Sequence, residues 1–197
     1  FGYGISEHQG VPVQVATYRD STGRPIAQKI RTRDKRFAWL GDGKQASLFG
    51  SHIWSRGKKL CIAEGELDAM ALAQAFGLKY ACVSLPSGAA SAVKAIRQNW
   101  DYVCGFSEII LAFDMDEAGR EAAQAVAEIL PVGRAFIADL PAKDACEALQ
   151  QNKVSELVSS VYQAAPFRPD GIREANEFRD VIAVDETESA VRWCYEG

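Results

Sequence analysis

Hydrophobic and polar positions follow two different periods along this chain, and the change falls near residue 60. Closer to the N-terminus, apolar residues occupy alternate positions such as Val13 and Val15, and residues 21–23 (Ser-Thr-Gly) interrupt the pattern before residues 26–30. Alternation on both sides of a turn signal predicts an antiparallel hairpin. From Leu60 onward, short apolar runs alternate with longer amphipathic stretches, which is typical of strands and helices that follow one another.

The second part of the chain predicts a regular series of strands and helices. Strands are expected at 60–63, 80–85, 109–113 and 134–140, and helices at 67–76, 90–100 and 117–130. Short connections between such units imply a mostly parallel sheet with helices on its faces. We therefore expect an α/β fold in which this sheet, flanked by helices, is preceded by a small basic α+β lobe. In such sheets, functional residues gather at the carboxyl ends of the strands.

Two prolines and a glycine lie close together near the C-terminus, at Pro166, Pro169 and Gly171. This cluster breaks regular structure and predicts a semi-rigid linker. The pattern therefore predicts three parts, which are an N-terminal lobe over 1–58, a main domain over 59–165, and a linker and tail over 166–197. The tail is expected to lead toward a further domain of a longer protein.

Composition narrows the class of protein. With 48% hydrophobic and 24% charged residues among 197, the chain has an ordinary globular make-up. No apolar run approaches the roughly 18 residues that a membrane span needs, and the N-terminus lacks an export signal. We therefore expect this protein to act in a cytoplasm and to have no membrane partner. The five cysteines show no Cys-x-x-Cys spacing, so neither a disulfide framework nor a zinc site is indicated.

Charge is divided unevenly along the chain. Residues 1–60 contain 11 Lys and Arg against 4 Asp and Glu, whereas the remaining 137 residues contain 11 against 22. A basic lobe therefore precedes an acidic one. Basic surface beside clustered carboxylates suits an enzyme that handles a polyanion with metal ions, although an uneven solvated surface would give the same sums.

Acidic residues follow several of the predicted strands, and they are Glu64, Asp68, Asp114, Asp116 and Asp144. Residues i and i+2 at an extended strand end point to the same side, so Asp114 and Asp116 should present two carboxylates together. Hard oxygen ligands suit Mg²⁺, which takes one or two carboxylates plus substrate phosphates. An isolated Asp-x-Asp is usually solvated or caps a helix, but acidic residues after three strands favour a metal site.

Basic residues alternate in the N-terminal lobe, at Lys29, Arg31, Arg33 and Lys35. Alternate positions on one strand share a face, so these four side chains are expected to line one groove that binds phosphates. A solvated strand face is the alternative interpretation.

Together, these motifs resemble the Toprim domain of bacterial-type primases, topoisomerases and some nucleases. The longer strings at residues 64–68 (Glu-Gly-Glu-Leu-Asp), 113–120 (Phe-Asp-Met-Asp-Glu-Ala-Gly-Arg) and 140–145 (Leu-Pro-Ala-Lys-Asp-Ala) are similar more narrowly to the primase-helicases of T-odd podophages. Residues 28–37 and 48–50 resemble that family's N-terminal polymerase lobe. The resemblance covers roughly residues 12–172.

The resemblance implies a DNA primase, a nucleotidyltransferase that makes short RNA primers on single-stranded DNA. Glu64 would be the general base or would position the attacking 3′-hydroxyl, and it would also bind metal. Asp114 and Asp116 would bind Mg²⁺, or Mn²⁺, with Asp144 and Asp68 in support. Lys29, Arg31, Arg33 and Lys35 would bind nucleotide or template.

The same resemblance implies partners. They are the single-stranded DNA template, ribonucleoside triphosphates, the helicase and zinc-binding domains of the parent chain, and a replicative DNA polymerase. This stretch of sequence has no zinc-binding cysteine set and no phosphate loop. It departs from its relatives at Cys146, where they usually place Asn or Asp, and an outer metal contact would be weaker there.

Two alternatives to a primase stay open. A metal nuclease would keep the same acidic residues, and a catalytically silent Toprim would serve only in the assembly of a helicase. A topoisomerase would need a nucleophilic tyrosine on a separate DNA-binding module, and the tyrosines here lie in no such module.

Overall fold

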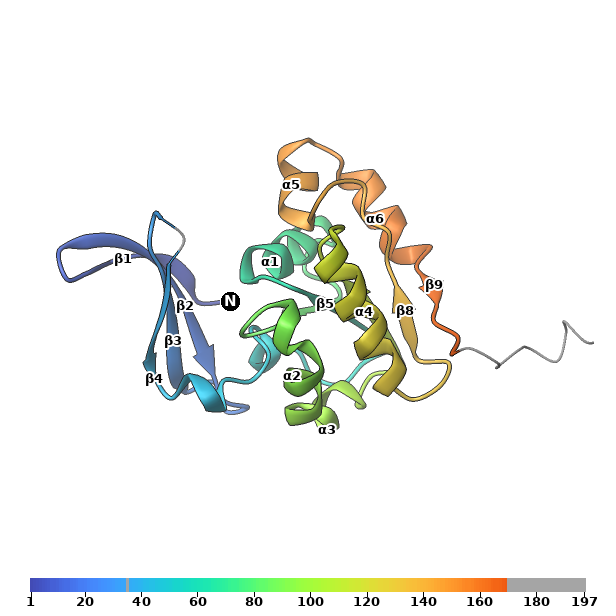
Figure 1. Cartoon of the computed structure of the whole chain (residues 1–197), viewed down its shortest axis with the longest axis horizontal. Coiled ribbons are helices and arrows are strands. Elements are labelled where there is room, and N and C mark those ends of the chain that lie inside the picture. The colour runs from blue at the N-terminus through green and yellow to red at the C-terminus, as the bar shows by residue number, and fades with distance from the viewer. Residues whose placement is uncertain (35, 170–197) are drawn as a thin grey trace, which may run out of the picture. The chain divides into compact units, whose positions relative to one another are not determined.

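A computed structural model describes residues 1–34 and 36–169, and the N-terminal part forms a four-stranded antiparallel sheet in the order β1-β2-β3-β4 (Figure 1). Its strands are β1 (Tyr3–His8), β2 (Val11–Arg19), β3 (Pro25–Arg31) and β4 (Phe37–Gly41). The predicted hairpin is β2 and β3, which pair in antiparallel register as expected. The strands β1 and β4 extend this hairpin on either side.

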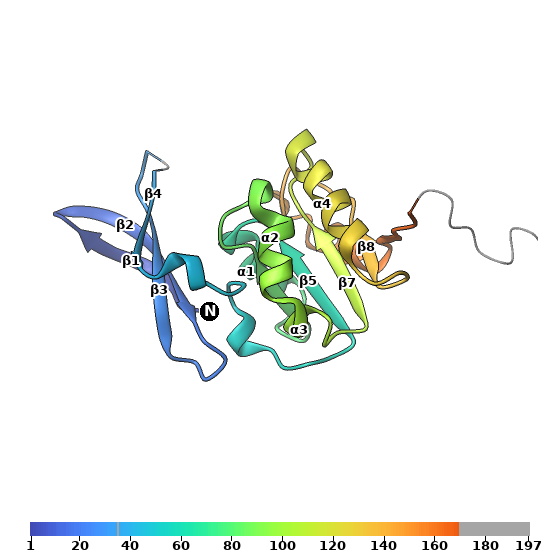
Figure 2. The same cartoon turned by 60° about the horizontal axis from the view of Figure 1, so that its bottom comes forward.

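The second sheet has five strands in the order β6-β5-β7-β8-β9 (Figure 2). They are β5 (Lys59–Ala63), β6 (Ala81–Ser84), β7 (Glu108–Ala112), β8 (Ala135–Ile137) and β9 (Ala165–Pro166). The first four are parallel to their neighbours, and β9 is antiparallel to β8. The α helices are α1 (Glu66–Ala75), α2 (Ala92–Gln98), α3 (Trp100–Val103), α4 (Glu117–Ile129), α5 (Ala145–Gln150) and α6 (Val154–Tyr162).

Both faces of the parallel sheet are covered, which explains why its strands are apolar runs rather than alternating ones. Leu60 and Ile62 of β5 point to a core shared with α2 and α4. Cys61 and Ala63 point to the opposite core, which is shared with α1, α5 and α6. The predicted α/β fold is therefore confirmed.

A connecting segment between the two sheets contains the short 3₁₀ helices η1 (Gly43–Gln45) and η2 (Ser51–Ile53). Phe49 of this segment is fully buried, and its backbone N–H and C=O both bond to Ser84 at the end of β6. The indole of Trp54 donates to the carbonyl of Cys82. These contacts join the antiparallel sheet to the edge of the parallel one.

Several predicted boundaries differ from those observed. The helix expected at 90–100 is divided into the 3₁₀ helix η3 (Ala89–Ser91), α2 and α3. The division falls at Asn99, whose side-chain amide and backbone N–H both donate to the carbonyl of Ala95. The strand expected at 134–140 is observed only over Ala135–Ile137, and beyond it Leu140 donates its N–H to the sulfur of Met115.

Residues Phe1–Phe167 form one compact unit. The boundary expected between residues 58 and 59 stays a prediction. The tail expected over 166–197 falls mostly outside the described residues. In the described part of the chain, no helix is long and apolar enough to cross a membrane.

Candidate active site

Acidic side chains meet where β5 and β7 end. The two strands are parallel neighbours with Ala63 opposite Ala112, so Glu64 and Asp114, which follow them, emerge at the same edge of the sheet. Glu64 accepts a hydrogen bond from the backbone N–H of Ala89 at 3.2 Å. The loop that carries this N–H therefore holds the Glu64 carboxylate in place.

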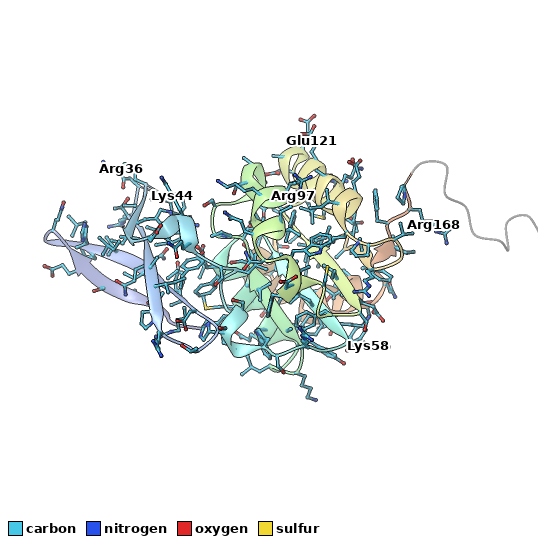
Figure 3. The ribbon with its side chains drawn as sticks, turned by 90° about the horizontal axis from the view of Figure 1, so that it is seen from below. Arg36, Lys44, Lys58, Arg97, Glu121 and Arg168 are labelled. Carbon is cyan, nitrogen blue, oxygen red and sulfur yellow. The ribbon has the colours of Figure 1, made fainter. Side chains whose placement is uncertain are left out.

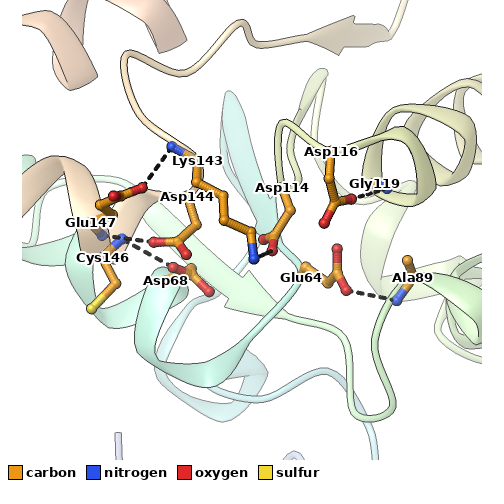
Figure 4. Close-up of polar contacts among 10 residues, drawn as sticks. All are labelled: Glu64, Asp68, Ala89, Asp114, Asp116, Gly119, Lys143, Asp144, Cys146 and Glu147. Atoms are coloured by element: carbon orange, nitrogen blue, oxygen red, sulfur yellow. Dashed lines mark hydrogen bonds and ion pairs between the residues drawn. The ribbon is translucent and has the colours of Figure 1, made fainter.

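Asp116 begins helix α4. Its Oδ1 accepts the backbone N–H of Gly119 at 3.0 Å, which is the hydrogen bond of a helix N-cap. Figure 4 shows the Asp116 and Glu64 side chains pointing toward one another, with Asp114 beside them. Asp116 therefore serves as a cap and also faces the carboxylates of the strand ends.

A second pair of carboxylates lies where α1 and α5 begin. Asp144 caps α5 by accepting the N–H of Glu147 at 2.7 Å, and Asp68 of α1 accepts the N–H of Cys146 at 3.0 Å. Figure 4 shows Asp68 and Asp144 side by side. Because residue 146 contacts Asp68 through its backbone, this contact does not depend on the side chain at that position.

Four of these carboxylates, those of Glu64, Asp68, Asp114 and Asp144, face the N-terminal sheet across one cavity of about 800 Å³. The charged residues that line it are Lys29, Arg31, Glu64, Glu66, Asp68, Asp114, Lys143, Asp144 and Glu147. Tyr3, Phe37 and Trp39 of the antiparallel sheet add aromatic walls. Among the described residues, Asp116 and Arg33 do not line this cavity.

Burial and neighbouring negative charges raise the pKa values of two of these carboxyl groups, Asp114 and Asp68. Burial, together with the negative charges of Glu64 and Asp144, raises the pKa of Asp114 to about 6. The ammonium of Lys143, 3.9 Å from Asp114, opposes this shift. Burial also raises the pKa of Asp68; the N–H of Cys146 works against this, and Asp144 adds to it. Nearby positive charge would stabilise the ionised form of every member of the set.

The donor set fits divalent cations. All five side chains offer hard carboxylate oxygens, and at Asp114 and Asp68 burial and neighbouring carboxylates raise the pKa, which a bound cation would offset. Within residues 1–34 and 36–169, no three His, Cys, Asp or Glu side chains form a ready-made metal cluster. An arrangement of this kind suits Mg²⁺, which needs one or two carboxylates and takes its other ligands from water and phosphates.

Lys29 has a partner that the sequence pattern does not reveal. Its ammonium lies 2.9 Å from Oε1 of Glu66, and the same oxygen accepts the hydroxyl of Tyr18 at 2.6 Å. Burial and the neighbouring Glu66 carboxylate raise the pKa of Tyr18, so its hydroxyl stays protonated and donates. Lys29 therefore faces the cavity as part of a buried ion pair. An ammonium has three donors, and the pair with Glu66 uses one of them.

The expectation that four alternating basic residues share one strand face is wrong for Arg33. Strand β3 ends at Arg31, and Arg33 lies exposed in the following turn. Asp34 in that turn accepts the hydroxyl of Thr32 at 2.5 Å, a local bond that favours a turn over a longer strand. Lys29 and Arg31 line the cavity. Lys35 lies outside the described residues, and its role stays a prediction.

The backbone at Asp114 packs so closely against Gly119 that no side chain fits at position 119. A Cβ at Gly119 would lie 2.2 Å from the carbonyl oxygen of Asp114. We expect Gly119→Ala to lower the free energy of unfolding by about 1–3 kcal/mol, the usual cost of overpacking, and to reduce activity by displacing Asp114. Denaturant unfolding measures the first effect. Gly4→Ala is the matched control because nothing lies within 4 Å of its Cβ position. Equal stability of the two variants would contradict this steric role.

Comparisons with known proteins agree with this geometry. A family model described as Toprim-like matches residues 61–149, and one described as Bacteriophage T7 DNA helicase/primase, N-terminal α+β fold, matches residues 1–41. The parallel sheet with its acidic edge is therefore a Toprim domain, preceded by an N-terminal lobe of the T7 type. A curated DNA helicase/primase of Enterobacteria phage T3 is 39% identical over 197 residues, which are 100% of this chain and 35% of that relative. The chain thus spans about a third of the relative's length.

Solved structures give the same result. The primase fragment of the bacteriophage T7 primase-helicase protein is 43% identical with a TM-score of 0.77, covering 81% of this chain and 67% of that one. A structure of bacteriophage T7 lagging-strand DNA polymerase with primase domains, an RNA/DNA hybrid and dTTP gives 43% identity and a TM-score of 0.80, covering 84% and 85%. The chain belongs to the family of phage T7-type primase-helicases and matches their primase part.

Proposed function

We propose that this chain synthesises short RNA primers on single-stranded DNA by metal-dependent nucleotidyl transfer. One observation carries the proposal. The carboxylates at the ends of β5 and β7 and the basic residues of β3 line the same cavity. A polymerase site needs both kinds of group, because the carboxylates hold cations while the basic side chains hold the phosphates of a polyanionic substrate.

Two groups of carboxylates would hold Mg²⁺, with Mn²⁺ as a substitute. Glu64, Asp114 and Asp116 form one group, and Asp68 and Asp144 form the other beside Asp114. When bound, such ions offset charge on the attacking and leaving oxygens of an in-line displacement.

The chain's own residues supply positioning and proton transfer. Glu64, fixed by the N–H of Ala89, would orient the attacking 3′-hydroxyl and accept its proton. Lys29 and Arg31 would bind the triphosphate from the opposite wall. Lys143 lies 3.9 Å from Asp114 and would shield its charge before substrate enters.

The relatives suggest the setting of this activity. The phage T3 relative is a DNA helicase/primase, and the T7 structure combines primase domains with a DNA polymerase and an RNA/DNA hybrid. We propose that the parent protein works in the cytoplasm of a phage-infected host, with a helicase domain, a zinc-binding domain that reads the template, and a replicative DNA polymerase. Ribonucleoside triphosphates and single-stranded DNA are the substrates.

Extension of a short oligoribonucleotide annealed to single-stranded DNA tests the proposal, because it does not depend on template recognition by another domain. We expect labelled ribonucleotide to be incorporated with Mg²⁺ or Mn²⁺ and not with excess chelator. Intact template after the reaction excludes a nuclease. Template cleavage without incorporation would favour the nuclease instead, and inactivity with both metals would favour a silent assembly module.

A further inference from the structure

Phe37 is an exposed aromatic residue inside a charged cavity. It begins β4, the last strand of the antiparallel sheet, and its side chain lines the cavity that contains the carboxylates. It is 55% exposed, whereas Tyr18 and Phe49 of the same lobe are buried. Burying an aromatic ring is favourable, so this ring gains from any flat apolar partner that enters the cavity.

Two cations fix the position of this ring. Arg31 is its direct cross-strand partner, and the Arg31 guanidinium carbon lies 5.6 Å from the ring centroid. The ammonium of Lys29 lies 4.9 Å from the same centroid. Each contact is a cation–π interaction, which attracts the cation to the ring face. Because Phe37 remains 55% exposed beside these two cations, part of its surface stays free for another partner.

We propose that Phe37 stacks on the base of the ribonucleoside triphosphate whose phosphates Lys29 and Arg31 hold. The cationic groups of Lys29 and Arg31, on the neighbouring strand, both lie within 5.6 Å of the centre of the Phe37 ring, so the three side chains offer an aromatic surface and two phosphate-binding groups together. A nucleotide has the matching chemistry, with a flat base and an anionic tail. This inference rests on the proposed function, because it names the subsite for one of that reaction's substrates.

Stacking explains how one site accepts different nucleotides. Every base has a π face, so an aromatic platform is tolerant of sequence and leaves base selection to the template. Purine bases offer a larger flat face than pyrimidines, so purine nucleotides should gain the most affinity from stacking. Trp39, two residues along β4, lies on the same wall of the cavity but packs against Tyr18 at 5.0 Å between centroids. Trp39 therefore supports the wall, and Phe37 has the freer surface.

Equilibrium binding of ATP and of inorganic tripolyphosphate, each with Mg²⁺, separates stacking from phosphate contacts, and binding of a single-stranded DNA oligonucleotide is measured beside them. We expect Phe37→Ala to weaken ATP binding by roughly 5- to 150-fold, the range measured for base–aromatic stacking, and to leave tripolyphosphate binding nearly unchanged. Phe37→Tyr should retain most of the ATP affinity, and Phe37→Leu should lose most of it despite its apolar side chain. Ile5→Ala is the matched control, since Ile5 is 83% exposed on the far edge strand β1.

Other outcomes would overturn the assignment. Equal weakening of ATP and tripolyphosphate by Phe37→Ala would mean that the ring only orients the two cations. A loss confined to single-stranded DNA binding would place a template base on the ring instead. Unchanged binding of all three ligands by Phe37→Ala would show that Phe37 does not stack on a base. ATP binding is measured without catalysis, so the two proposals can fail separately. If the wild-type chain made no RNA but bound ATP in a way that depends on Phe37, the proposed function would be contradicted and this subsite would still hold.

Discussion

Asp114→Asn should abolish nucleotide incorporation while the chain stays folded. Asp114 lies between the two groups of carboxylates, and burial, followed by the negative charges of Glu64 and Asp144, raises its pKa to about 6. Asparagine keeps the shape but removes the charge that would bind a divalent cation. We expect a loss of at least roughly 10³-fold, the upper end of what removing one electrostatic stabiliser costs an enzyme.

Although Asp114→Asn should lose activity, its folded state should be at least as stable as that of the wild type. A carboxyl whose pKa is raised by folding destabilises the folded state once the pH rises above its ordinary range, because the ionised form is the disfavoured one. Without divalent cations at neutral pH, Asp114→Asn should therefore unfold at an equal or higher denaturant concentration than the wild type. Incorporation over a Mg²⁺ series and denaturant unfolding measure the two effects.

Glu121→Gln is the control for Asp114→Asn, since it removes an exposed negative charge from α4 (Figure 3). It should leave both readouts unchanged. Near-wild-type synthesis by Asp114→Asn at limiting Mg²⁺ would show that Asp114 is not part of the metal site.

The second large effect is expected from Glu66→Ala. The side chains of Glu66 and Lys29 are only 11% and 13% exposed, and Glu66 also accepts the hydroxyl of Tyr18. Removing the carboxylate leaves a buried ammonium and a buried hydroxyl without their partner, and breaking a buried pair in this way costs about 3–5 kcal/mol. The free energy of unfolding should fall by about that amount.

Arg36→Ala provides the comparison for the buried pair. Arg36 and Asp34 form an ion pair whose side chains are exposed, and Figure 3 shows Arg36 projecting from the N-terminal lobe. Solvent screens such pairs, so no measurable loss is expected. Replacing both buried partners, as Glu66→Leu with Lys29→Met, should recover much of the stability lost by Glu66→Ala, since apolar side chains need no partner. A Glu66→Ala variant as stable as Arg36→Ala would mean that the pair contributes nothing to the fold.

Local sequence patterns predicted the alternating strands and helices of the parallel sheet well. Apolar runs and amphipathic stretches identified β5 to β8, α1 and α4, because each is defined by residues that are neighbours in sequence. Strand β1 was missed because it contains Gly4, Ser6 and Glu7, and helix α5 because it has only six residues. Both depend on pairing or packing with distant parts of the chain.

The candidate site shows the same limit. The rule that parallel strands end together was enough to expect Glu64 and Asp114 at one edge. The partner of Lys29 was not predictable, because Glu66 lies 37 positions away, at the start of helix α1. Glu66 had a local signal, since it sits between two predicted site residues in the string Glu-Gly-Glu-Leu-Asp. Its contact with β2 and β3 follows only from the packing of the two sheets.

The contacts of the two edge strands of the parallel sheet, β6 and β9, affect how this sheet can bind other chains. Strand β6 has its Cys82 carbonyl and both backbone groups of Ser84 occupied by Trp54 and Phe49. At the opposite end, β9 has two residues, and one is Pro166, which has no N–H to donate. Natural sheets resist edge-to-edge aggregation by such means. Within the described residues, therefore, the parallel sheet offers little free backbone for strand addition, and we expect partners to recognise its side chains.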